Sequence, residues 1–160
     1  MLDVLAANPP EPAFDAAWLE RKLASEIPLA RHLGIAVLSA EEPALRLCAP
    51  LAPNRNHQGT AFGGSLFSLA VLTGWAWTTR FLERGGFDAD AVVQDSSIHY
   101  LAPARGTLES VLEAPAAEAV GRLQRMLERA GRGRIRLAVE VRVARLTVAR
   151  FEGSFVATRR

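Results

Sequence analysis

One stretch of the chain, residues 64–84, constrains the fold more than any other part of the sequence. It has the length of a helix, and the two glycines at 85–86 are a typical helix end. A helix that is apolar all round must be enclosed by other structure, and a sheet wrapped around it would do so. The run at 66–77 is interrupted by polar residues and is shorter than the roughly 20 that a bilayer requires. Its apolar residues point to nearly every side: Leu66, Phe67, Leu69, Ala70, Val71, Leu72, Trp75, Ala76 and Trp77.

The rest of the chain supplies a sheet. Residues 135–143 alternate strictly between apolar side chains and mostly charged ones, as a strand with one wet face requires. The same reasoning and the positions of the prolines predict further strands at 34–39, 44–49, 92–101, 107–112 and 151–157.

Two amphipathic helices complete the predicted elements. The first, residues 16–26, follows an N-cap at Asp15 and stops before Pro28. The second, residues 116–130, has apolar side chains at helical spacing and ends at Gly131. The order of elements predicts an α+β fold in which an antiparallel sheet curls around one long buried helix.

Composition excludes several classes of function. The 160 residues carry a formal charge of +2, and arginines are mixed with 17 acids, so no basic stripe for nucleic acid is present. One cysteine cannot form an internal disulfide, and the three histidines lack the spacing of metal ligands, so no metal or other cofactor is expected. The N-terminus lacks the basic start and apolar stretch of a signal peptide. We expect a cytoplasmic protein without membrane partners, with a flexible lead at 1–13 and one domain at 14–160.

Two segments carry the residues that point to a function. Residues 56–66 read Asn-His-Gln-Gly-Thr-Ala-Phe-Gly-Gly-Ser-Leu, and residues 95–103 read Asp-Ser-Ser-Ile-His-Tyr-Leu-Ala-Pro. The first resembles the Asn-x-x-Gly-x-x-His-Gly-Gly signature of hotdog-fold thioesterases of the phenylacetyl-CoA type. The second resembles the strand that follows the hotdog helix. Together with Gly74 and Trp75, these segments are more similar still to the thioesterase domain that occurs alone or C-terminal to an acetyltransferase domain.

The resemblance implies a hotdog fold and the hydrolysis of an acyl thioester carried by coenzyme A or an acyl carrier protein. It also implies a homo-oligomer, either a dimer or a dimer of dimers, joined through the strand at 92–101. A long edge strand favours such pairing on physical grounds as well.

Gly63 and Gly64 would begin the buried helix, where free N–H groups and the positive end of the helix dipole face outward. A thioester carbonyl could approach this backbone closely, and the N–H groups would stabilise the negative charge that develops on its oxygen. Phe62 precedes them and belongs to the same predicted substrate-binding segment. The alternative is that the glycine pair only allows tight packing of the helix against the sheet.

The chain departs from the related signature at two positions. Phe62 stands where that signature has histidine, and Val71 stands where the phenylacetyl-CoA type has its acidic residue. The usual pair that activates water is therefore missing. This keeps open a second function, an acyl-thioester-binding or regulatory domain without chemistry. An acyl dehydratase is a third possibility, but its chemistry usually needs a histidine–acid pair.

Three other residues are candidates for catalysis. Asp95 is a carboxylate in an otherwise apolar strand and could be the general base, or it could be a structural aspartate. Asn56 could orient water or the carbonyl, or it could be a turn residue. His57 is a second candidate base, because histidine titrates near neutral pH, although loop histidines are often simply exposed.

Overall fold

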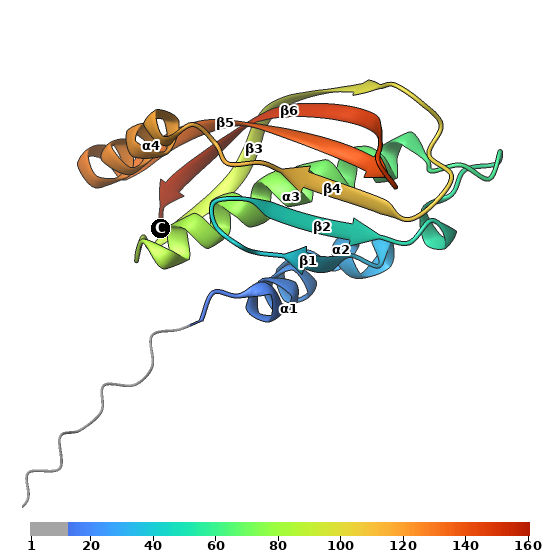
Figure 1. Cartoon of the computed structure of the whole chain (residues 1–160). Coiled ribbons are helices and arrows are strands. Elements are labelled where there is room, and N and C mark those ends of the chain that lie inside the picture. The colour runs from blue at the N-terminus through green and yellow to red at the C-terminus, as the bar shows by residue number, and fades with distance from the viewer. Residues whose placement is uncertain (1–12) are drawn as a thin grey trace, which may run out of the picture.

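A curved antiparallel sheet and a long helix form the body of the molecule (Figure 1). The computed structural model describes residues 13–160, so the predicted lead at 1–13 lies outside the described residues except for Ala13. The helices are α1 (Ala16–Glu26), α2 (Pro28–Leu33), the 3-10 turn η1 (Ala52–Asn54), α3 (Gly63–Arg84) and α4 (Ala117–Ala130). The strands are β1 (Ala36–Ser39), β2 (Leu45–Ala49), β3 (Ala89–Tyr100), β4 (Leu108–Leu112), β5 (Arg132–Val143) and β6 (Leu146–Arg159).

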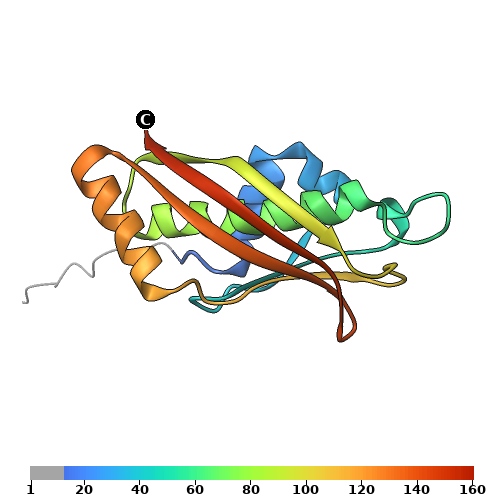
Figure 2. The same cartoon turned by 90° about the horizontal axis from the view of Figure 1, so that it is seen from above.

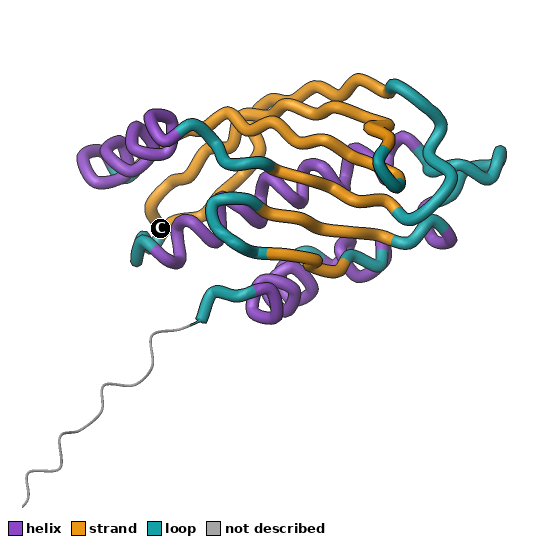
Figure 3. The backbone as a smooth tube through the Cα atoms, viewed as in Figure 1, coloured by secondary structure: helices purple, strands orange, loops and turns teal. Residues whose placement is uncertain are grey.

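The strands form a single sheet in the order β1-β2-β4-β5-β6-β3, and every neighbouring pair is antiparallel. Figure 3 shows the strands as one continuous curved surface. The two edges differ greatly, because β1 has four residues and β3 has twelve. This arrangement confirms the predicted α+β fold, with an antiparallel sheet curled around one long helix.

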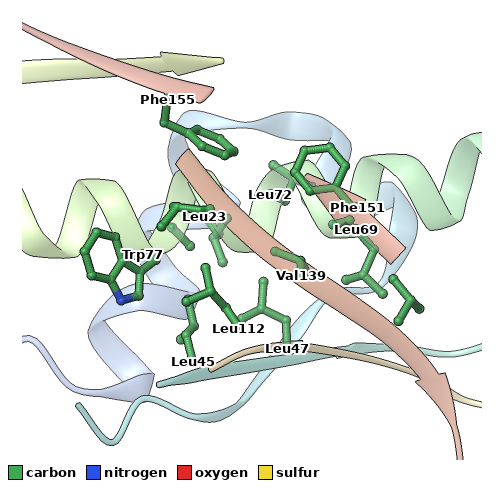
Figure 4. Packing of buried hydrophobic residues seen from close by; sticks show 14 of the residues in the cluster. Leu23, Leu45, Leu47, Leu69, Leu72, Trp77, Leu112, Val139, Phe151 and Phe155 are labelled. Atoms are coloured by element: carbon green, nitrogen blue, oxygen red, sulfur yellow. The ribbon is translucent and has the colours of Figure 1, made fainter. Parts of the chain in front are cut away.

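The core lies between α3 and the concave face of the sheet, along which α3 runs (Figure 2). Phe151 and Phe155 of β6 are fully buried against the helix, as are Leu45 and Leu47 of β2 (Figure 4). Alternation along the strands explains the pattern, since β5 buries every second residue from Gly133 to Val141. The apolar periods read from the sequence therefore point into one common core.

The smaller helices agree with the predicted boundaries, with one correction. Asp15 caps α1, since its Oδ1 accepts a hydrogen bond of 2.9 Å from the N–H of Trp18. Pro28 does not only stop α1; it also begins α2, because proline lacks only an N–H that the first turn leaves free. Helix α4 buries Leu123 and Leu127. Within residues 13–160, no helix is long and apolar enough to cross a membrane.

Candidate active site

The loop before α3 is held in place by a buried asparagine that the sequence pattern did not single out. Asn54 is 1% exposed, and its Nδ2 donates hydrogen bonds of 2.8 Å to the carbonyls of both Leu33 and Pro50. The backbone carbonyl of Asn54 accepts a hydrogen bond of 2.7 Å from the N–H of Phe62. Asn54 therefore links η1, the end of α2 and the start of α3. In the sequence it is one polar residue of a polar loop, and nothing in that pattern marks it as buried.

Asn56 shapes the turn that follows. Its Oδ1 accepts hydrogen bonds from the N–H groups of Gln58 (2.9 Å) and Thr60 (3.2 Å), and its Nδ2 donates to the Thr60 hydroxyl (3.0 Å). Both ends of the amide are thus engaged inside the loop. This geometry matches the turn-residue interpretation of Asn56. His57 is exposed in the same turn.

Helix α3 begins with backbone N–H groups that have no protein partner. Phe62 is the N-cap and offers no side-chain hydrogen bond, while its carbonyl accepts from the N–H groups of Ser65 (2.9 Å) and Leu66 (3.1 Å). Within residues 13–160, no oxygen accepts a hydrogen bond from the N–H of Gly63 or Gly64. An uncapped helix start of this kind attracts a negatively charged oxygen through its free donors and its dipole.

Two aromatic rings occupy the space that side chains at positions 63 and 64 would need. A Cβ at Gly63 would lie 3.2 Å from the Tyr100 ring, and a Cβ at Gly64 would lie 2.4 Å from Cε1 of Phe62. Tyr100, at the end of β3, also donates a hydrogen bond of 2.9 Å from its hydroxyl to the Gly63 carbonyl. The Phe62 side chain is 57% exposed, so its ring covers the helix start from the solvent side.

Asp95 does not lie where a simple reading of its strand predicts. Alternation alone would place it on the face of Val93, which is the face toward α3. A β-bulge between these residues shifts the register, so that Val93 pairs with Phe155 but Asp95 pairs with Ser154. The Asp95 carboxylate therefore points to the outer face of the sheet, where it is 60% exposed and 3.7 Å from Arg136.

The apolar surroundings that the sequence suggested for Asp95 are therefore absent within residues 13–160 of this chain, and its role as a general base stays a prediction. Asp95 also precedes Tyr100 by five residues, which is about 16 Å of extended strand. The described chain thus brings Phe62, Gly63, Gly64 and Tyr100 together, with Asn56 and His57 in the adjoining loop, and keeps Asp95 apart from them.

Val71, which replaces the acidic residue of the related signature, lines an apolar cavity of about 260 Å³. This position offers no group that could activate water. Burial raises the pKa of the Cys48 thiol, which disfavours the thiolate that a nucleophile requires. Among the described residues, no group of three or more His, Cys, Asp or Glu side chains could hold a metal ion.

Comparisons with known proteins agree with this arrangement. Residues 16–159 match the model of a family described as putative thioesterase (yiiD_Cterm). A putative thioesterase from Shewanella oneidensis is 31% identical with a TM-score of 0.79, over 89% of this chain and 96% of the other. A protein of unknown function from Chlorobaculum tepidum is 25% identical with a TM-score of 0.85, over 91% and 94% of the two chains. A Haemophilus influenzae thioesterase shares the fold at 16% identity, with a TM-score of 0.72 over 90% of each chain.

Proposed function

The chain belongs to the putative thioesterase (yiiD_Cterm) family, and we propose that it hydrolyses acyl thioesters carried by coenzyme A or by an acyl carrier protein. One observation carries the proposal: the two free N–H groups of Gly63 and Gly64 at the uncapped start of α3. A thioester carbonyl is neutral in the ground state and becomes an oxyanion when water attacks. Hydrogen-bond donors already in place at this position therefore stabilise the transition state more than the bound substrate.

The reaction follows from this geometry. The oxygen of water bonds to the carbonyl carbon, and the carbonyl oxygen gains negative charge beside the Gly63 and Gly64 N–H groups. The carbon–sulfur bond then breaks, the carrier leaves as a thiol after taking up a proton, and the acyl group leaves as a carboxylic acid. The Tyr100 hydroxyl, bonded to the Gly63 carbonyl, holds this first turn of the helix in position.

The group that takes the proton from water is proposed to be His57. It is exposed in the loop that leads to Phe62 and the glycine pair, whereas Asp95 is on the opposite face of the sheet and paired with Arg136. Asn56 is proposed to act indirectly, by holding the shape of the loop that carries His57. Positioned general bases contribute about 10²–10⁴-fold to rates.

A panel of acyl-CoA substrates, with release of free thiol as the readout, tests the proposal. The His57→Ala variant should lose about 10²–10⁴-fold in kcat. Asp95→Asn is the matched control, since it removes a charge from the outer face and should leave kcat nearly unchanged. The opposite result would make Asp95 the base and would require a second subunit or a rearranged strand. No thiol release from any acyl-CoA by the unmodified protein would refute the activity.

A second candidate function is an acyl-thioester-binding domain without hydrolysis. It is favoured by Phe62 and Val71, which stand where the related signature has a histidine and an acid. In that case the free N–H groups would bind the ground-state carbonyl, and calorimetry would show binding of acyl-CoA without thiol release.

The active unit is proposed to be a homodimer joined along β3. This strand is a twelve-residue edge, and its exposed apolar side chains include Val92, Val93 and Tyr100. Unpaired edges of this length favour pairing with another strand, and a second copy of β3 supplies one. Light scattering at micromolar concentration should give at least twice the 17.3 kDa monomer mass, and a stable monomer would contradict this.

A further inference from the structure

The apolar cavity that contains Val71 lies beside α3, between that helix, the sheet and the α1–α2 corner, to which Ile27 belongs. Its volume of about 260 Å³ is below the usual range for sites that enclose a whole small ligand, about 300–1,000 Å³. It can therefore hold one end of a molecule while the rest lies outside. The residues of α3 and of the sheet that the argument uses are Phe67, Ser68, Val71, Trp75, Val93 and Phe155.

The cavity and the helix start share one face of α3. Gly64, Ser68, Val71 and Trp75 are separated by four, three and four residues, which is the spacing of a single stripe along a helix. The ring of Phe62 lies over Gly64 at the beginning of this stripe. A ligand whose carbonyl binds at the Gly64 N–H could therefore extend along this face of α3 into the cavity.

The length of the stripe sets the size of that group. From Gly64 to Trp75 the helix rises about 16 Å, at about 1.5 Å per residue. An extended chain of single bonds advances about 1.2 Å per bond, because the three bonds of an extended residue span about 3.6 Å. At this advance per bond the stripe spans about thirteen bonds, so it matches an acyl chain of about fourteen carbons, with its end near Trp75.

The lining sets the chemistry of the group. Its side chains are apolar except for the hydroxyl of Ser68, and none is ionisable. A charged or strongly polar chain end would lose its hydration there without gaining partners. We propose that this cavity binds the end of the hydrocarbon tail of an acyl group of about fourteen carbons, and that Val71 and Trp75 determine its length. This inference rests on the proposed thioesterase function, whose oxyanion site begins the same stripe.

Chain-length kinetics test the inference. For butyryl- to tetradecanoyl-CoA, kcat/KM should rise by about fourfold per methylene that enters the cavity, the effect of burying one CH₂ group. Val71→Phe should end this rise at about nine carbons, because position 71 lies about 10 Å along the stripe and the added ring occupies the middle of the cavity. Val71→Ala should extend the rise to longer chains, and it keeps the test valid if the larger side chain disrupts folding. Leu38→Phe, on the exposed side of β1, is the matched control and should keep the unmodified profile.

Binding of tetradecanoate, followed by tryptophan emission, separates this inference from the proposed hydrolysis. Tetradecanoate should shift the emission, butanoate should not, and Trp75→Phe should abolish the shift while Trp18→Phe keeps it. A shift without any thioester hydrolysis would refute the proposed function and leave the tail site standing. Hydrolysis that is insensitive to chain length and to both Val71 variants would overturn the tail site alone. If neither hydrolysis nor a shift occurs, for instance because a second copy fills the cavity, both proposals fail.

Discussion

Gly74 lies in the middle of α3 against the ring of Phe155, and its replacement by alanine is expected to destabilise the protein. A Cβ at position 74 would lie 2.3 Å from Cζ and 2.5 Å from Cε2 of that ring. Phe155 is completely buried, so the ring must move by about 1 Å within packed surroundings to restore ordinary contact. Overpacking of this kind costs about 1–3 kcal/mol. Alanine gains about 1 kcal/mol in helix propensity, so the expected net loss is about 0–2 kcal/mol.

Gly121 of α4 provides the matched control, because a Cβ there would meet only the end of the flexible Arg125 side chain at 3.2 Å. Gly121→Ala should therefore stabilise the protein by about 0.5–1 kcal/mol. Urea unfolding of both variants, at one fixed protein concentration, measures the two changes. The double variant Gly74→Ala/Phe155→Leu should recover part of the loss. A Gly74→Ala protein that gains as much stability as Gly121→Ala does would refute the packing argument and the position assigned to Phe155 as a cavity wall.

Three further predictions concern single contacts. Tyr100→Phe removes the hydroxyl bonded to the start of α3, and kcat/KM should fall by about fivefold, the effect of one ordinary hydrogen bond, with little change in thermal unfolding. Glu42→Ala removes the carboxylate 3.1 Å from the buried guanidinium of Arg80, and urea unfolding should show that the free energy of unfolding falls by about 2–3 kcal/mol. Removal of one partner of an exposed ion pair should cost less, because water then solvates the charge that is left. The hydrogen bond from Arg142 holds the pKa of Glu140 below its usual 4.5, so its stabilisation is present above that value and disappears as pH falls. Glu140→Gln should therefore reduce the drop in Tm between about pH 5 and pH 3, and an unchanged drop would contradict the assignment.

The elements of the fold could be predicted because their signals are local. The apolar character of α3 and the strict alternation of β5 are properties of consecutive residues, and both led to the observed structure. The burial or exposure of individual polar residues could not be predicted in this way. Arg80 is 3% exposed on α3, and Asn54 is buried in a polar loop, because each is enclosed by segments that are distant in the chain.

The amino-acid sequence by itself determined the helix that must be enclosed, the strands that enclose it and the glycine pair that begins the helix. Each follows from side-chain periodicity or from backbone freedom at a few neighbouring positions. Only the tertiary structure decided that the Gly63 and Gly64 N–H groups stay unpaired and that Asp95 faces away from them. The physical reason is register: one bulged residue in β3 exchanges the two faces of the strand, and cross-strand pairing with β6 determines where that bulge lies.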